Sequence, residues 1–143
     1  MKTETFRAAI ENLHQMLAFI HDYSLTQHFQ SDARSKIILA AEEALVNIIN
    51  YGYPHEPGTI EITCKDAKEK KGITLLFRDY AVPFNPISEA PVAKNSPPPP
   101  PSLEEGAKKG GYGIYIFIGA MDHINYQRLA DGNLLEMTKY LIE

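Results

Sequence analysis

Residues 31–52 read SDARSKIILAAEEALVNIINYG, and the spacing of the apolar residues in this stretch predicts a helix. Ser31 is the expected N-cap, the helix runs from Asp32 or Ala33 to about Tyr51, and Gly52 supplies a left-handed stop. The helix has one wide apolar face, which needs a second layer to cover it. The residues of that face are Ile37, Ile38, Ala41, Ala44, Leu45, Ile48 and Ile49.

The segments on either side complete the expected fold. Apolar residues three and four apart predict a first helix from Arg7 to about Tyr23. Alternating patterns predict four strands, at Thr59 to Lys65, Ile73 to Arg78, Asp122 to Leu129 and Asn133 to Leu141. An apolar run just before the third strand, from Ile114 to Met121, predicts a short buried helix. This order favours an α+β fold, a two-layer sandwich with helices on one face of a mixed, largely antiparallel sheet.

Length and composition limit the class of protein. The chain has 143 residues, which suits a single domain over 1–143. The net charge of −4 and the absence of a long basic run argue against direct nucleic-acid binding. One cysteine, Cys64, excludes an internal disulfide and a multi-cysteine zinc site, and fits a packing role. No stretch has the length of a signal peptide core or a membrane span, so we expect a soluble cytoplasmic protein.

Prolines mark one long connection. Eight of the ten prolines fall between Pro83 and Pro101, and consecutive prolines impose an extended path. The segment from about Val82 to Lys109 is therefore expected to form one long irregular connection, which in a small domain is usually a functional lid or a disordered insert. The run Pro97 to Pro101 also fits a docking ligand for an aromatic-lined groove.

The helix at 31–52 carries a narrow polar strip beside its apolar face, formed by Lys36, Glu43, Asn47 and Asn50. Glu43 and Asn47 stand one turn apart at the border of the core. In this position Glu43 suits a general base, and the amide oxygen of Asn47 suits a Mg²⁺ ligand. The alternative is an ordinary helix edge that faces water.

Two further features suit a nucleotide. Asp79 ends an apolar strand, where a carboxylate either accepts a hydrogen bond from the exocyclic amine of a base or caps a turn. Gly110, Gly111 and Gly113 precede an apolar helix, and bare N–H groups at a helix start can receive phosphate. A Rossmann fingerprint is absent, because Gly110 follows a loop and not a strand.

Taken in order, these motifs resemble the anti-sigma-factor serine kinases of the GHKL ATPase superfamily over about Ser31 to Leu141. The residues that carry the resemblance are Glu43-Ala44-Leu45-Val46-Asn47, Tyr51-Gly52-Tyr53, Asp79-x-Ala81-x-Pro83-Phe84-x-Pro86, Gly111-Tyr112-Gly113-Ile114, Asp122, Tyr126 and Gly132-Asn133.

The resemblance implies a Bergerat fold that binds ATP and Mg²⁺ under a lid from Pro86 to Gly110. It implies that Glu43 is the catalytic base, that Asn47 binds the metal and that Asp79 meets the adenine amino group. The nucleotide-binding set that it implies is Asn47, Asp79, Ala81, Pro83, Lys109, Gly111 and Gly113.

The resemblance also implies partners. A protein of this family holds a sigma factor inactive, regulates transcription in this way, and phosphorylates a serine of an anti-anti-sigma protein of the STAS type. It further implies a homodimer.

Two residues depart from the family pattern. Ala81 stands where the family has glycine, and its methyl group weakens binding if the position needs a positive φ or a close approach to adenine. Lys109 stands where related sequences often carry the first glycine of the second box, and either contacts phosphate or marks a different loop path. These departures motivate the alternative of a non-catalytic nucleotide-binding module that sequesters a partner protein.

Overall fold

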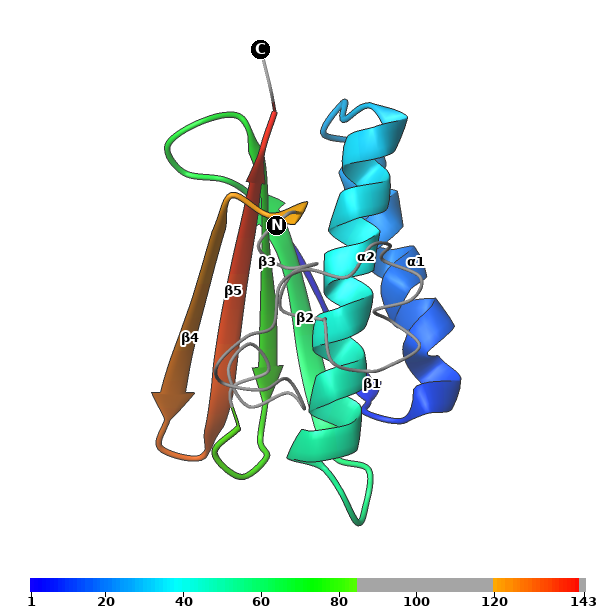
Figure 1. Cartoon of the computed structure of the whole chain (residues 1–143), viewed down its shortest axis with the longest axis vertical. Helices are drawn as coiled ribbons and strands as arrows, with labels where there is room; N and C mark the ends of the chain where they lie inside the picture. Colours follow the sequence, from blue (N-terminus) through cyan, green and yellow to red (C-terminus); the bar gives the residue numbers. More distant parts are fainter. Residues whose placement is uncertain (85–119, 142–143) are drawn as a thin grey trace, which may run out of the picture.

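The computed structural model describes residues 1–84 and 120–141, and in these residues two α-helices lie on one face of a five-stranded sheet (Figure 1). The predicted α+β two-layer fold is therefore confirmed. In chain order the elements are β1 (Lys2–Arg7), a 3₁₀ turn (Ile10–Asn12), α1 (Leu13–Leu25), α2 (Ser31–Asn47), a π-helical turn (Ile48–Gly52), β2 (Thr59–Asp66), β3 (Gly72–Asp79), β4 (His123–Leu129) and β5 (Gly132–Tyr140).

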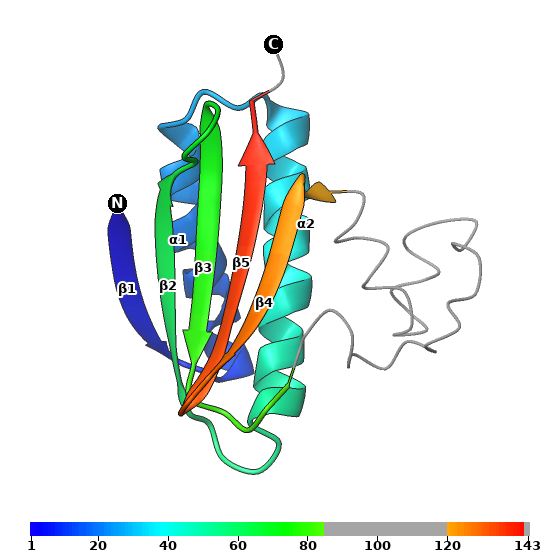
Figure 2. The ribbon, with the colours of Figure 1, turned by 90° about the vertical axis from the view of Figure 1, so that its left-hand side faces the viewer.

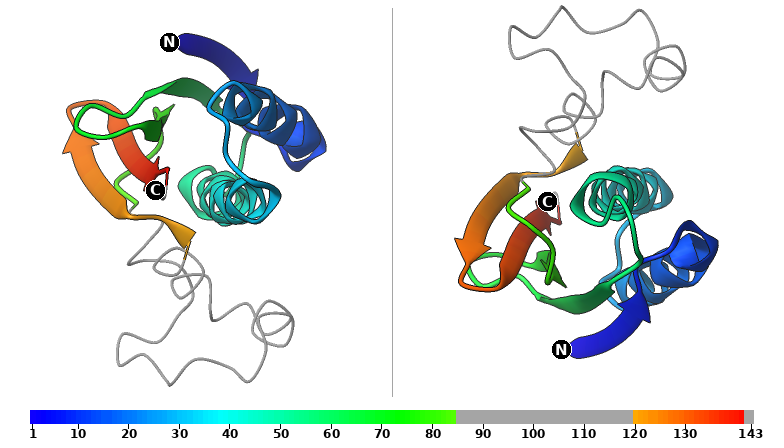
Figure 3. Two further views of the ribbon diagram at one scale, coloured as in Figure 1. Left: turned by 90° about the horizontal axis from the view of Figure 1, so that it is seen from above. Right: turned by 90° about the horizontal axis from the view of Figure 1, so that it is seen from below.

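The strands lie in the order β1-β2-β3-β5-β4, and each of these four neighbouring pairs is antiparallel. Figure 2 shows the strands side by side, with α1 behind the β2 side of the sheet and α2 behind the β5 side. The end-on views in Figure 3 show both helices on the same side of the sheet. Because β5 runs antiparallel to β3, the β4–β5 turn and the start of β5 at Asn133 lie next to the end of β3 at Asp79.

The N-terminal strand was not predicted. The sequence pattern placed a helix from Arg7, whereas Lys2–Arg7 pairs with β2 and α1 begins only at Leu13. Phe6 is the one buried side chain of this strand, so its sequence lacks the alternation that marks a half-buried strand. The conformation of β1 is determined by pairing with the edge of β2, more than fifty residues away in the sequence. The local sequence pattern does not determine it.

The ends of α2 also differ from the prediction. Gln30 is the N-cap and Ser31 is the first helical residue. The carbonyl of Gln30 accepts the first hydrogen bond of the helix, from the N–H of Arg34 at 3.0 Å. Gln30 is extended and makes no side-chain hydrogen bond to the helix. At the other end, the regular helix stops at Asn47 and continues as a π-helical turn to Gly52. Such turns often occur at functional sites.

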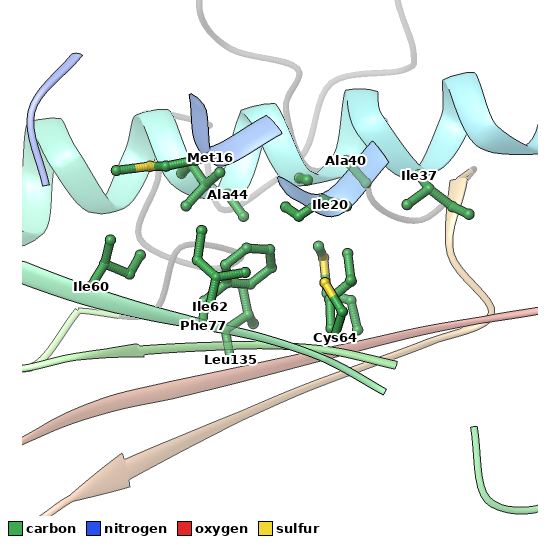
Figure 4. Packing of buried hydrophobic residues seen from close by; sticks show 14 of the residues in the cluster. Met16, Ile20, Ile37, Ala40, Ala44, Ile60, Ile62, Cys64, Phe77 and Leu135 are labelled. Atoms are coloured by element: carbon green, nitrogen blue, oxygen red, sulfur yellow. The ribbon is translucent and has the colours of Figure 1, made fainter. Parts of the chain in front are cut away.

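Side chains from both layers fill the space between the helices and the sheet. Figure 4 shows Met16 and Ile20 of α1 and Ile37 of α2 facing Ile62 and Phe77 of the sheet. All of these side chains are fully buried, and each contributes about 1.5–3 kcal/mol relative to an exposed position.

Cys64 has the packing role that its sequence context predicted. It is fully buried, and burial raises the pKa of its thiol to about 12. The thiol therefore stays protonated at neutral pH and is a poor nucleophile.

Two predicted segments fall largely or wholly outside the described residues. Of the helix expected at Ile114 to Met121, only Ala120 and Met121 are described, and both are buried. The lid expected at about 86–110 lies outside the described residues altogether. Among the described helices, none is both long and apolar enough to span a bilayer.

Candidate functional site

Asp79 is a buried carboxylate at the end of β3. It is 2% exposed and pairs across the sheet with Asn133 of β5. Its Oδ1 accepts a hydrogen bond from the backbone N–H of Ala81 at 3.0 Å and another from Nδ2 of Asn133 at 2.8 Å. Both bonds end on Oδ1, so acceptor capacity on Oδ2 remains for a further N–H donor.

The electrostatic state of Asp79 reflects two opposed effects. Burial raises the pKa of this carboxyl above its ordinary value, because a low-dielectric site disfavours the charge. The N–H groups of Ala81 and Asn133 and the nearby Arg78 guanidinium lower the pKa again, but less. The site thus holds a carboxyl acceptor in a place that water reaches poorly, where a hydrogen bond to a ligand is stronger than in water.

Asn133 holds the loop that follows Asp79. Its Nδ2 also donates to the carbonyl of Val82 at 3.0 Å, and its Oδ1 accepts from the N–H of Phe84 at 3.3 Å and from the hydroxyl of Tyr126. This one side chain therefore fixes both the carboxylate and the next five residues.

Sequence reasoning named Asn133 among the motif residues that carry the resemblance but gave it no role in the site. The signal that identifies it is the strand register, since a polar residue in a buried strand lies opposite Asp79. Arg128 of β4 continues the same row across the sheet, and its Nη1 donates to the carbonyl of Ala81 at 2.8 Å.

Replacing Asn133 by alanine should destabilise the fold by about 3 kcal/mol. The change removes the side-chain donor to the buried Asp79 carboxylate and the donor to the carbonyl of Val82, and lost hydrogen bonds to buried charged groups are costly. Urea unfolding of the Asn133→Ala variant measures the loss. Asn125→Ala, an exposed position on the neighbouring strand β4, is the matched control and should change stability by less than about 0.5 kcal/mol. Equal stability of the two variants would contradict the role of Asn133.

The loop after Asp79 packs against the end of the helix that carries Glu43 and Asn47. The rings of Tyr51 and Phe84 lie 5.7 Å apart, and a Cβ placed on Gly52 would lie 3.3 Å from the Cβ of Ala81. Figure 1 shows the ends of α2 and β3 at the same end of the molecule. The fold thus brings the two parts of the predicted site to one end of the sandwich.

Ala81 needs no positive φ. In residues 1–84 and 120–141, His28 is the one non-glycine residue with a positive φ, at 63°. The methyl group of Ala81 is buried, at 6% exposure, and occupies the space that Gly52 leaves open. The first reason for which Ala81 was expected to weaken binding therefore does not apply. Pro83 is an exposed residue of the same loop.

Glu43 and Asn47 lie on the side of α2 that faces away from α1. Glu42, one residue earlier, lines a cavity with His21 of α1, whereas Glu43 and Asn47 follow Lys36 along the other side. Asn47 is 7% exposed and Glu43 is half-buried. Burial, and then the charge of Glu42, raises the pKa of Glu43 above its ordinary value. A carboxylate with a raised pKa is a better proton acceptor near neutral pH.

The remaining predicted residues, Lys109, Gly111 and Gly113, lie outside the described residues. Within the described parts of the chain, no three His, Cys, Asp or Glu side chains gather as a metal site. The helix α2 provides an amide oxygen and a carboxylate as possible metal ligands. Such oxygen ligands suit a Mg²⁺ ion that takes most of its other ligands from phosphate and water.

Comparison with known proteins places the chain beside a protein family and a named kinase. The family model described as "Histidine kinase-like ATPase domain" matches residues 6–139. The chain is also similar to the serine/threonine-protein kinase BtrW of Bordetella bronchiseptica, with 25% identity over 142 residues that cover 97% of this chain and 94% of that protein.

Proposed function

Because this chain belongs to the histidine kinase-like ATPase domain family, we propose that it binds ATP with Mg²⁺ and acts as a serine/threonine protein kinase. The observation that carries the proposal is the buried Asp79 carboxylate, held by Asn133 next to the end of the helix that bears Glu43 and Asn47.

Asp79 recognises the base in this proposal. Its Oδ2 accepts a hydrogen bond from the exocyclic amino group of adenine, while Ala81 and Asn133 keep Oδ1 in place. A guanine or hypoxanthine ring presents an oxygen at the corresponding position, which a carboxylate repels. The buried acceptor therefore selects adenine over 6-oxo purines.

Asn47 and Glu43 serve the phosphates and the acceptor. The amide oxygen of Asn47 binds Mg²⁺, which supplies neutralisation of the phosphate charge. The hydroxyl oxygen of the acceptor serine bonds to the γ-phosphorus, and the bond from that phosphorus to the β,γ-bridging oxygen breaks. ADP leaves with the bonding electrons, and the hydroxyl proton passes to the carboxylate of Glu43.

The name of the Bordetella relative supports the choice of a serine/threonine kinase over a plain ATPase. The motifs shared with anti-sigma-factor kinases lead us to propose the same role here: an anti-sigma factor that phosphorylates an anti-anti-sigma protein of the STAS type. In this role it acts in the cytoplasm, as a homodimer, and holds its sigma factor inactive. Transfer of labelled phosphate from ATP to a STAS-type protein encoded nearby is the direct test.

The competing function is a non-catalytic module that sequesters a partner. Calorimetry with ATP and ADP separates the two. Failure to bind either nucleotide at millimolar concentration, with or without Mg²⁺, eliminates the kinase. Binding without any transfer to the partner leaves the module.

Replacing Asn47 by alanine should remove the dependence of ATP affinity on Mg²⁺. We expect the wild type to bind ATP at least about tenfold more tightly with Mg²⁺ than without, since a metal contact contributes at least as much as a charged hydrogen bond. The Asn47→Ala variant should bind metal-free ADP normally and gain nothing from Mg²⁺. Asn50→Ala is the control, because Asn50 is exposed and three residues further along the same stretch. A full Mg²⁺ effect in the Asn47→Ala variant would remove Asn47 from the metal site.

A further inference from the structure

A cavity between the start of α2 and the end of β5 lies far from Asp79. It is lined by residues at the start of α2 and at the end of β5, which are His28, Phe29, Gln30, Asp32, Ala33, Lys36, Lys139, Tyr140 and Leu141. Its volume is about 410 Å³, within the range of small-ligand pockets. Since Ser31 and Asn47 are the first and last residues of α2, this cavity is roughly 24 Å from the candidate kinase site along the helix axis.

Lys139 is the unusual residue of this cavity. It points from β5 toward the helix layer, because it pairs with the fully buried Ile73 on the inner face of the sheet. The residue is only 8% exposed, and lysine is almost never so buried without a partner. Yet within the described part of the chain its side chain makes no hydrogen bond, ion pair or ring contact.

The ammonium of Lys139 opens into the cavity. In residues 1–84 and 120–141, every side-chain nitrogen or oxygen either has a hydrogen-bond partner or is accessible to water. The Nζ atom of Lys139 is therefore accessible to water, and it reaches the solvent through the cavity that Lys139 lines. Among the described residues no carboxylate forms an ion pair with this ammonium, so the position suits an anion from solution.

Two further features of the cavity favour an anion. The first turn of α2 has no side-chain cap, so its free N–H groups, at Ser31 to Ala33, carry the positive end of the helix dipole. Lys36, one turn further on, adds a second ammonium to the same cavity. Asp32 also lines the cavity and opposes an anion, but its single charge meets two lysines and the helix start.

We propose that this cavity is a second anion site, which binds a phosphate group through Lys139, Lys36 and the N–H groups of the first turn of α2. A phosphate group matches it because it is compact, carries close to two negative charges at neutral pH and offers several acceptor oxygens. The group comes either from free inorganic phosphate or from a phosphate monoester such as phosphoserine. Both sources present the same chemistry to the two lysines.

Titration of the full ¹⁵N-labelled chain, without nucleotide and at constant ionic strength, tests the site. Inorganic phosphate in one arm and O-phosphoserine in the other should cause saturable shifts of the amide signals of Ser31, Asp32 and Ala33. The tighter of the two ligands identifies the source. Serine at the same concentrations should leave these signals unchanged.

Variants of the charged residues in the cavity should change the phosphate affinity in opposite directions. Lys139→Met and Lys36→Met should each weaken phosphate binding about tenfold, since each removes one charge-assisted hydrogen bond. Asp32→Asn should tighten binding severalfold, which a damaged fold would not do. Lys65→Met is the matched control, because Lys65 is a strand lysine on the opposite face of the sheet, and it should leave the affinity unchanged.

Three results would overturn the site. They are shifts that grow without saturation, shifts that serine reproduces, and a Lys139→Met variant that binds phosphate as tightly as the wild type. If Lys139→Met does not fold, the Lys36→Met and Asp32→Asn variants test the site, because both positions are exposed. The proposal then requires both that Lys36→Met weakens phosphate binding and that Asp32→Asn tightens it.

Discussion

Replacing Asp79 by asparagine should weaken ATP binding strongly and leave the fold as stable as before. The amide oxygen of asparagine can still accept the hydrogen bonds from Ala81 and Asn133. Its NH₂ group, however, replaces Oδ2 and presents donors where the amino group of adenine also presents donors. We expect a loss of at least about 100-fold in ATP affinity, because a charged hydrogen bond is lost and two donors are left facing each other.

The stability of this variant follows from the sign of the pKa shift. Burial raises the pKa of Asp79, so the folded protein takes up this proton at a higher pH than the unfolded chain does. The stabilisation that this linkage supplies is present at low pH and is lost as the pH rises through the folded-state pKa. At neutral pH the buried charge therefore costs stability, and asparagine removes that cost. Urea unfolding at neutral pH should give the variant a free energy of unfolding no lower than that of the wild type, within about 1 kcal/mol.

Calorimetry with two nucleotides makes the Asp79→Asn test specific. The wild type should prefer ATP to inosine triphosphate, whereas the variant should lose this preference, because the asparagine NH₂ can donate to a 6-oxo group. Asp131→Asn is the control at an exposed position of the nearby β4–β5 turn, where loss of the ion pair with Arg78 has little effect. Unchanged ATP affinity in the Asp79→Asn variant would show that this carboxylate does not meet the base.

The Glu43→Gln variant should bind ATP nearly as well as the wild type but transfer phosphate about 10² to 10⁴ times more slowly. Glutamine keeps the size and polarity of the side chain but cannot accept the proton of the serine hydroxyl. Single-turnover transfer from labelled ATP measures the rate, and calorimetry measures the affinity. Glu42→Gln is the matched control, because Glu42 faces the α1 side of the helix and its loss leaves the base in place. Removing the charge of Glu42 lowers the pKa of Glu43 somewhat, so the control should keep a fast transfer rate at neutral pH.

The pH profile gives the role of Glu43 a second readout. Burial and the charge of Glu42 raise the pKa of Glu43, so the base is lost to protonation at a higher pH than an ordinary glutamate would be. The wild-type rate should fall on the acid side of its profile at this raised pKa, and this acid limb should be absent in the Glu43→Gln variant. Transfer by that variant at the wild-type rate would exclude Glu43 as the base.

The sequence predicted the fold wherever the pattern is local. The second helix and the four strands at β2 to β5 were expected within about one residue of their observed ends, apart from the π-helical turn after Asn47. The strand β1 was missed because a single buried side chain, Phe6, leaves no alternation to detect. The N-cap of α2 was misplaced by one residue, because Ser31 has the favoured side chain but Gln30 has the backbone geometry.

The sequence predicted the main residues of the candidate site but not the contacts that hold them in place. Asp79, Glu43 and Asn47 are recognisable because each is a polar residue where the pattern expects a core or an edge. Asn133 and its contacts were not, because they depend on the register of a hairpin 54 residues from Asp79. The fit of Ala81 over Gly52 likewise follows from a contact between distant segments, which no local pattern contains.

The hydrogen bond between Asn133 and Asp79 also has a consequence for the order in which the protein acquires its properties. Loop closure over 54 residues is slow compared with the formation of a helix or a hairpin, so this contact belongs to the late events of folding. Until β5 has docked beside β3, a nascent or partly folded chain lacks the rigid acceptor for a base. Ligand can therefore stabilise only molecules that have already completed the sheet, and cannot rescue earlier intermediates from proteolysis.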